Sequence, residues 1–228
     1  MSILLITATS LEAEPLFKER KWEEQSCQLA KLYKYKNIYL AHLGLAKTNT
    51  AAGLALLIQK LKPKSVIQFG IAGMYPKSGL KLAQVVVAET ETHIDCGLKT
   101  KNGFGMQELG FPLLEKEKNY YNVFPMNQGL KKEFIMLGLE PKPFATSETI
   151  TTNLEDANGI ESAFKVAVES MEGAAAAQVC LALDTAFIEL RAISNVVGER
   201  NKDNWELQNA VNAVNIAVIA YLSRHSSE

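Results

Sequence analysis

Short apolar runs alternate with stretches of helical spacing along most of the chain. Continuous apolar runs at Ser2–Ala8, Ser65–Phe69 and Ala83–Ala88 are typical of strands buried on both faces. Between the first two, Thr48–Leu61 has apolar residues at helical spacing and stops at Lys62-Pro63-Lys64. This alternation predicts an α/β fold with a central mixed, largely parallel sheet flanked by helices.

The same patterns extend to the C-terminus without a linker, an internal repeat or a low-complexity segment, so residues 1–228 are expected to form one domain. The segment Lys99–Asn119 is glycine-rich and lacks periodicity, which indicates a long, mobile, functional loop. The other expected elements are strands at Asn37–Leu43, Lys165–Val168 and Ala186–Ile193, a helix starting near Leu11 with Thr9 or Ser10 as its cap, and helices at Glu172–Leu183 and Trp205–Ser223.

Composition and charge narrow the class of protein. The hydrophobic fraction of 47% and the charged fraction of 21% are those of an ordinary soluble domain. A net charge of −1 gives no reason to expect a nucleic-acid or membrane partner, and no apolar run reaches the roughly 18 residues of a membrane helix.

The apolar start is short and lacks a basic segment, so it is read as a strand and not as a signal peptide. Cys27, Cys96 and Cys180 are too widely spaced to indicate disulfides or zinc, so we expect a cytoplasmic protein.

Candidate ligand-binding segments stand at the ends of four expected strands, where α/β sheets bind ligands. Glu12 follows the first strand, and Gly70–Gly73 follows the strand at 65–69. Met171-Glu172 follows the strand at 165–168, and Arg191–Asn195 closes the strand at 186–193. Unpaired polar groups in apolar surroundings cost several kcal/mol, so their presence requires a reason. Four segments converging on one sheet edge predict a ligand site there.

Each segment also has a purely structural interpretation. Glu12 could be a solvated first-turn acid that favours the helix dipole, and Gly70–Gly73 a tight strand-to-helix turn. Glu172 could be an ordinary acid at a helix start, with Arg191 and Asn195 paired to it in a structural network. These alternatives remain open from the residues alone.

Several kinds of catalytic site are not indicated. The chain has no GxSxG turn and no P-loop, and His42, His93 and His225 have no spacing that suggests a triad or a metal site. What remains is a site without metal or cofactor, built from carboxylates, an arginine and an asparagine.

The combination of Glu12, Met171-Glu172 and Arg191–Asn195 resembles the nucleoside hydrolase branch of the purine nucleoside phosphorylase superfamily. Within that branch, Ser194–Arg200 followed by Trp205 is similar to the SNxVGxR stretch and tryptophan of futalosine hydrolases. The resemblance covers most of the chain. It implies hydrolysis of the N-glycosidic bond of futalosine, with release of hypoxanthine, as a step of the menaquinone route.

The resemblance also implies a role for each matching residue. Glu12 would activate the attacking water, Glu172 would accept hydrogen bonds from the ribose hydroxyls, and Met171 would pack against the sugar. Arg191 would lie beside the water and the acids, and Asn195 would bind the purine base. These roles meet the needs of an oxocarbenium-like transition state, in which water is activated, cationic ribose is stabilised and the departing base receives hydrogen bonds.

Further substrate contacts are implied, together with a homo-oligomer, commonly a dimer, in which a loop of one subunit covers the site of the other. The glycine-rich segment around Phe104 and Phe111 is the candidate for that loop. The other candidate substrate-binding residues are Ile71, Ala72, Gly73, Ile150 and Thr151.

Two departures from the family pattern refine the expected reaction. Adenine-cleaving members have an aspartate where this chain has Asn195, and an amide cannot deliver a proton, which favours a 6-oxopurine. Because asparagine can also pair with adenine, a methylthioadenosine/S-adenosylhomocysteine or aminodeoxyfutalosine nucleosidase stays an alternative, as does a non-catalytic nucleoside-binding protein. Thr7–Pro15 has no glycine or arginine, and Gln68 stands where phosphorylases have another arginine, so water is the expected acceptor.

Overall fold

The computed structural model describes residues 2–101 and 103–225, which form one α/β domain around a large mixed sheet. The strands of this sheet are β1 (Ile3–Thr7), β2 (Glu23–Gln25), β3 (Lys31–Tyr35), β4 (Ile38–His42), β5 (Ser65–Met74), β6 (Val85–His93), β11 (Val123–Pro125), β12 (Glu140–Thr146), β13 (Val168–Ser170) and β14 (Ala186–Val196).

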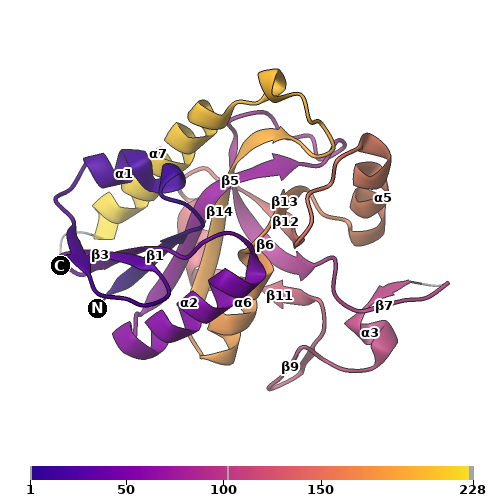
Figure 1. The fold of residues 1–228 in the computed structure, drawn as a ribbon, viewed down its shortest axis with the longest axis horizontal. Helices are drawn as coiled ribbons and strands as arrows, with labels where there is room; N and C mark the ends of the chain where they lie inside the picture. The colour runs from indigo at the N-terminus through magenta and orange to yellow at the C-terminus, as the bar shows by residue number, and fades with distance from the viewer. Residues whose placement is uncertain (1, 102, 226–228) are drawn as a thin grey trace.

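Helices cover both sides of the sheet. The helices are α1 (Glu14–Lys18), α2 (Ala46–Leu61), α3 (Met106–Leu109), α4 (Gln128–Ile135), α5 (Leu154–Phe164), α6 (Gly173–Ala182) and α7 (Leu207–His225), with 3-10 turns at Leu11–Ala13 and Lys202–Asn204. In Figure 1, α1 and α7 lie on one side of the sheet, and α2 and α6 lie together on the other. The expected mixed sheet flanked by helices is confirmed.

Five strands of the sheet close on themselves. The path β6-β12-β13-β5 is joined into a ring by β14, which pairs in parallel with β5 and antiparallel with β6. Outside the ring, β1 runs parallel to β5 and to β4, and the edge is completed by β3 and β2. Side chains of the ring strands such as Phe69, Phe144 and Leu190 are fully buried. The ring therefore gives a rigid frame whose strand ends hold the polar residues.

The segment Gly70–Gly73 is a strand and not the tight turn that its glycines suggested. It continues β5 to Met74 and pairs with β14 over its whole length. Glycine is needed here because side chains press on the backbone: a β-carbon on Gly70 would lie 2.1 Å from Glu12 Oε1, and one on Gly73 would lie 2.8 Å from a methyl group of Val197.

The expectation that Thr9 or Ser10 caps a helix is wrong. A 3-10 turn, Leu11–Ala13, precedes α1, and Ser10 makes no capping side-chain hydrogen bond. Instead, Glu12 turns back and accepts from the backbone N–H groups of Ala8 and Thr9. These N–H groups belong to the end of β1 and the loop after it, whereas a capping hydroxyl would accept from N–H groups two or three residues after the cap.

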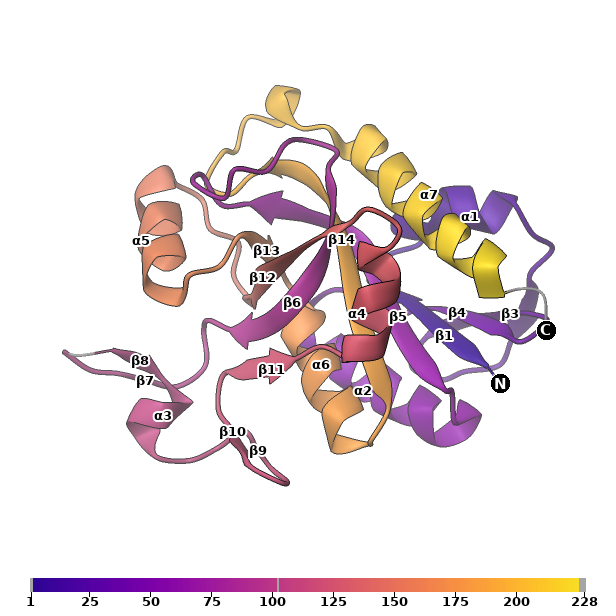
Figure 2. The same ribbon diagram turned by 180° about the vertical axis from the view of Figure 1, so that it is seen from behind.

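The segment Lys99–Asn119 is not free of regular structure. It contains α3 and parts of two short hairpins and projects from the body of the domain (Figure 2). The hairpin strands are β7 (Leu98–Lys99), β8 (Phe104–Gly105), β9 (Leu114–Glu115) and β10 (Asn119–Tyr120).

The strand expected at Lys165–Val168 begins later, at Val168. Lys165 instead ends α5 in the left-handed conformation, with φ 56°. This small shift places Met171 and Glu172 directly after the end of β13, at the start of α6.

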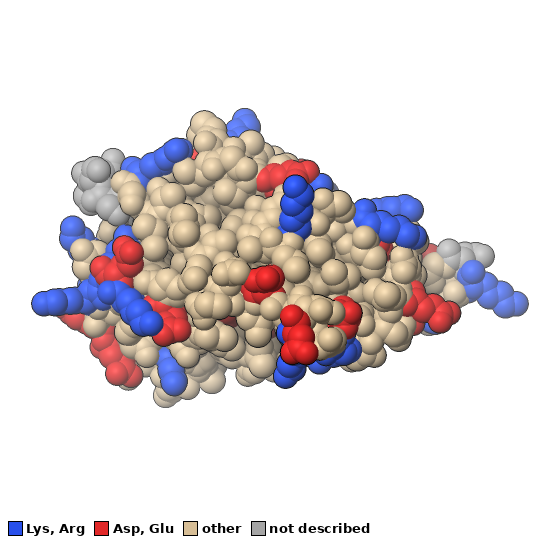
Figure 3. All heavy atoms as spheres, turned by 90° about the horizontal axis from the view of Figure 1, so that it is seen from above, with Lys and Arg blue, Asp and Glu red and all other residues tan. Residues whose placement is uncertain are grey.

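The molecular surface shows mixed charge. On the face in Figure 3, Lys and Arg side chains are interspersed with Asp and Glu side chains and form no continuous basic patch. Among residues 2–101 and 103–225, no helix has both the length and the apolar character required to cross a bilayer.

Candidate active site

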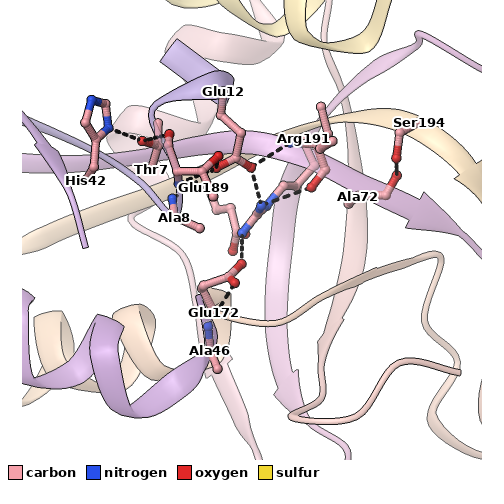
Figure 4. Close-up of polar contacts among 12 residues, drawn as sticks. Thr7, Ala8, Glu12, His42, Ala46, Ala72, Glu172, Glu189, Arg191 and Ser194 are labelled. Carbon is pink, nitrogen blue, oxygen red and sulfur yellow. Dashed lines mark hydrogen bonds and ion pairs between the residues drawn. The ribbon is translucent and has the colours of Figure 1, made fainter. Parts of the chain in front are cut away.

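Arg191 is the centre of the polar cluster at the strand ends. Its Nη2 lies 3.0 Å from Glu172 Oε2, and its Nη1 lies 3.5 Å from Glu12 Oε1 and donates to the carbonyl of Ile71 at 3.0 Å. Figure 4 shows Glu12 and Glu172 on opposite sides of the guanidinium. All three charged side chains are almost fully buried, so these contacts are formed away from bulk water.

Glu12 is held on both oxygens. Oε2 accepts from the N–H groups of Ala8 and Thr9, both at 3.0 Å, and Oε1 accepts from the N–H of Ile71 at 3.2 Å. Burial raises the pKa of Glu12, and the negative charge of Glu172 raises it further. Arg191 and the N–H groups of Thr9 and Ile71 only partly offset that rise. A fixed carboxylate with a raised pKa is suited to accept a proton from water.

Glu172 is held by a second element as well as by Arg191. Its Oε1 accepts from the backbone N–H of Ala46 at 3.2 Å, at the start of α2. Ala46 has φ 75°, in the left-handed region that residues with a β-carbon rarely adopt. This strained residue presents its N–H to Glu172, and strain of this kind is found at functional sites.

A third carboxylate fixes Arg191 from behind. Glu189 Oε1 lies 2.7 Å from Arg191 Nε, and Glu189 is completely buried. Burial alone would lower the pKa of Arg191, but the negative charges of Glu189, Glu172 and Glu12 raise it above the ordinary value. Arg191 is therefore a permanent cation whose three nitrogens each contact a protein oxygen.

Asn195 is aimed by an irregularity in β14. The pairing with β5 shifts between Ile193 and Asn195, so Ser194 is an additional residue there. The Ser194 hydroxyl lies 2.8 Å from Asn195 Oδ1 and 3.1 Å from the carbonyl oxygen of Ala72, while Asn195 Nδ2 donates to the carbonyl of Val196. One N–H of the amide remains available for a ligand.

A cavity of about 370 Å³ opens beside these groups. It is large enough for a nucleoside-sized ligand, whose sites usually span about 300–1,000 Å³. Apart from Phe104, every residue singled out from the sequence as catalytic or substrate-binding lines it: Glu12, Ile71, Ala72, Gly73, Ile150, Thr151, Met171, Glu172, Arg191 and Asn195.

Phe104 lies elsewhere. It packs edge-on against Phe164, with ring centroids 6.1 Å apart, and lines a separate cavity at the base of the projecting segment. Within the described part of this chain, Phe104 is therefore not part of the main cavity.

Three acids near the cavity were not identified from the sequence. Glu169 lines its wall and accepts from the hydroxyls of Tyr75 at 2.7 Å and Thr151 at 2.8 Å. Glu91 and Glu189 lie deeper, both completely buried. The only available signal was at Glu189, which lies inside the apolar strand expected at Ala186–Ile193, since ionisable groups are seldom buried without partners. Glu91 and Glu169 lie just beyond the strands expected at Ala83–Ala88 and Lys165–Val168.

The histidines do not join this cluster. His42 Nδ1 lies 2.7 Å from Thr7 Oγ1, and burial lowers the pKa of His42 to about 4. Within the described ranges, no group of three or more His, Cys, Asp and Glu side chains is arranged to hold a metal ion. The geometry thus offers a buried carboxylate base, a second carboxylate, a fixed cation and an amide around one cavity.

Comparison with known proteins gives consistent matches. A family model of the phosphorylase superfamily matches residues 2–223. The chain is 37% identical to futalosine hydrolase of Thermus thermophilus over 79% of each protein. It is 25% identical to a 5′-methylthioadenosine/S-adenosylhomocysteine nucleosidase of Oceanobacillus iheyensis over 90% of this chain and 91% of that protein.

Solved structures show the same fold. The native futalosine hydrolase of Helicobacter pylori superimposes with a TM-score of 0.84 over 98% of each chain, at 20% identity. A 5′-methylthioadenosine/S-adenosylhomocysteine nucleosidase of Neisseria meningitidis, in complex with methylthio-immucillin-A, also gives a TM-score of 0.84, at 22% identity over 98% of this chain and 99% of that one.

Proposed function

This chain belongs to the phosphorylase superfamily, and from that membership we propose that it is a nucleosidase that hydrolyses the N-glycosidic bond of futalosine. The products are hypoxanthine and dehypoxanthine futalosine, which makes the reaction a step of menaquinone biosynthesis. The observation that carries the proposal is the position of Glu12 and Glu172 on either side of Arg191, at the wall of the cavity that Asn195 also lines.

Each residue has a defined part in the reaction. As the bond between the anomeric carbon and the base breaks, a water oxygen attacks that carbon and one water proton passes to Glu12. Glu172 accepts from the ribose hydroxyls and stabilises the positive charge that develops on the sugar. Met171 packs on the sugar, and Asn195 donates to the departing base, which gains negative charge and takes up a proton from solvent to become neutral hypoxanthine. Glu12 returns its proton to solvent before the next turnover.

The electrostatics of the cluster support water, and not phosphate, as the acceptor. Arg191 is surrounded by the carboxylates of Glu12, Glu172 and Glu189, so the cluster as a whole attracts no dianion. Gln68, which stands where phosphorylases have an arginine, is buried in β5 and does not line the cavity. Neither Arg191, which is paired with carboxylates, nor Gln68, which is uncharged, therefore offers a phosphate ion a free cation.

Base release measured by chromatography tests this proposal. Purified protein is incubated with futalosine, methylthioadenosine and inosine, each with and without phosphate. Phosphate-independent release of hypoxanthine from futalosine is the expected result. Phosphate-dependent release with formation of a sugar phosphate would contradict hydrolysis.

Two other functions predict different results. The identity to 5′-methylthioadenosine/S-adenosylhomocysteine nucleosidases favours an adenine-releasing enzyme, and adenine from methylthioadenosine in the same experiment would establish it. Tight nucleoside binding without any released base would establish a binding protein instead.

The assembly and location of the protein are further parts of this proposal. We expect a cytoplasmic homodimer in which Phe104 and Phe111 of one subunit reach the site of the other. Phe111 is 67% exposed in the single chain, which fits a side chain that is covered on association. Sedimentation of the wild type and of Phe111→Ser tests this, and a fully active monomer at assay concentration would overturn it.

A further inference from the structure

Behind Arg191, on the side away from the cavity, lie two carboxyl groups that the reaction does not use. Glu91 on β6 and Glu189 on β14 are both completely buried. Their side chains face the same point: a β-carbon built on Gly173 would lie 2.2 Å from Glu91 Oε1 and 2.0 Å from Glu189 Oε2. These two oxygens are therefore within about 4 Å of each other, and Gly173 leaves the space that they occupy.

Each of the other two carboxylate oxygens of the pair accepts a hydrogen bond from the protein. Glu189 Oε1 accepts from Arg191 Nε at 2.7 Å, and Glu91 Oε2 accepts from the Thr146 hydroxyl at 2.8 Å. Thr146 Oγ1 itself accepts from the N–H of Ala174, so its own hydrogen points to Glu91. Only Glu91 Oε1 and Glu189 Oε2 are left without a partner of their own, and both are inaccessible to solvent.

We propose that Glu91 and Glu189 share one proton between these two oxygens and act as a positioning pair that fixes Arg191 by its Nε atom. The proton stands on Glu91 Oε1 and is donated to Glu189 Oε2. The pair then bears a single negative charge, which is matched by the guanidinium. Two adjacent buried carboxylates would otherwise repel each other with no water to screen them.

The groups around the pair do not remove this repulsion between the two carboxylates in another way. Burial raises the pKa of Glu91 well above its usual value, the charge of Glu189 raises it further, and Arg191 opposes this. Tyr75, which directly follows β5, interacts electrostatically with Glu91, but its hydroxyl hydrogen is donated to Glu169. From α6, the pair faces the uncharged residue Gly173.

The pair controls how Arg191 acts on the catalytic side. Held at Nε, the guanidinium plane directs Nη1 to Glu12 and Nη2 to Glu172. The single charge of the pair also sets how strongly Arg191 favours the ionised form of Glu12. This functional consequence rests on the proposed nucleosidase reaction, whereas the shared proton does not.

Infrared spectroscopy tests the proton without any substrate. At neutral pH, the wild-type protein is expected to show the carbonyl stretch of a protonated carboxylic acid. Glu91→Gln removes that band, because the amide N–H replaces the shared proton, and Glu12→Gln retains it. Absence of the band in the wild type, or its persistence in Glu91→Gln, would overturn the shared proton even if futalosine is the substrate.

Activity against any nucleoside that the enzyme cleaves tests the positioning role. Glu91→Leu has no donor for Glu189 Oε2 and is expected to lower kcat by about tenfold or more, whereas Glu91→Gln restores the donor and most of the rate. The acid limb of the pH profile should keep its wild-type position in Glu91→Gln. It should move to lower pH in the double variant Glu91→Gln, Glu189→Gln, where the pair has lost its charge. If the acid limb lay at the same pH in the single and double variants, the charge of the pair would have no effect on the ionisation of Glu12.

Discussion

Gly70 and Glu12 are in such close contact that a single additional carbon on Gly70 would overlap the carboxylate. A β-carbon on Gly70 would lie 2.1 Å from Glu12 Oε1 and 2.8 Å from Arg191 Nη1. Gly70 lies inside β5, so the small residue is needed for the space beside the strand and not for a turn. The position of the proposed base therefore depends on a residue that performs no chemistry.

Gly70→Ala is expected to abolish most of the activity by displacing Glu12 from Arg191. Overpacking at such a site also costs about 1–3 kcal/mol of folding free energy, so thermal unfolding should be measured together with base release. Gly79, whose β-carbon would meet no atom within 4 Å but whose φ is 73°, offers a comparison in Gly79→Ala. That variant is expected to lose some stability through backbone strain while keeping the rate. Full activity in Gly70→Ala would contradict the assigned position of Glu12.

Glu12→Gln is expected to reduce kcat by about 10²–10⁴-fold, because the amide cannot accept the proton of the attacking water. The neighbouring Glu14, whose side chain is exposed and paired only with Lys18, provides the control in Glu14→Gln. Single-turnover base release distinguishes the two, and equilibrium binding of the substrate shows whether the Glu12 variant still forms the complex. Unchanged turnover in Glu12→Gln would refute the mechanism.

The pH dependence of kcat/KM follows from the raised pKa of Glu12. Glu12 must be ionised to accept a proton, so activity falls as the pH drops through its pKa, and the acid limb should lie above the ordinary value of 4.5. The effect on stability has the opposite sense. A carboxyl group with a raised folded pKa stabilises the fold most below its unfolded pKa, and this contribution is lost as the pH rises through the folded pKa. An acid limb at or below 4.5 would contradict the raised pKa.

The sequence predicted most of the site because its residues follow apolar strands. β1 and the first half of β5 are continuous apolar runs, and β14 is largely apolar. Glu12 follows β1, whereas Ile71 and Arg191 lie within β5 and β14, and all three line one cavity. The site residues are therefore recognisable without knowledge of how the strands are ordered. The resemblance to nucleoside hydrolases then added the role of each residue.

The closed ring of strands could not be predicted in the same way. β12 contains Pro141 and Pro143, which are rare inside strands, and its pairing with β6 shifts between Lys142 and Pro143. β13 has only three residues, and the strand expected at Lys165–Val168 overlaps it only at Val168, so its register was not defined by the sequence. Without these two strands, the pairing that closes the ring has no signal in the sequence.

The buried acids escaped prediction for a related reason. Glu91 follows the strand expected at Ala83–Ala88 and stands two residues after Glu89, and Glu189 is a single acid within an expected strand. From sequence order alone, acids at such positions are interpreted as solvent-facing. Their burial depends on the contact between β6, β14 and the start of α6, which are separated in the sequence and brought together only by the fold. Long-range contacts of this kind are visible only in three dimensions.

Asn195→Asp is expected to change the preferred base. An aspartate at this position can donate a proton to a ring nitrogen of the leaving purine, which adenine requires more than hypoxanthine because it is the poorer leaving group. The ratio of kcat/KM for an adenine nucleoside to kcat/KM for its hypoxanthine counterpart should therefore rise by about tenfold or more. The two substrates must have the same 5′ substituent, so that the ratio reports on the base alone.

Asn195→Ala is the matched control: it removes the donor without supplying an acid and should slow both reactions while leaving adenine disfavoured. If the aspartate variant kept the wild-type ratio, Asn195 would not be the residue that selects the base, and the inference of a 6-oxopurine from this position would fail.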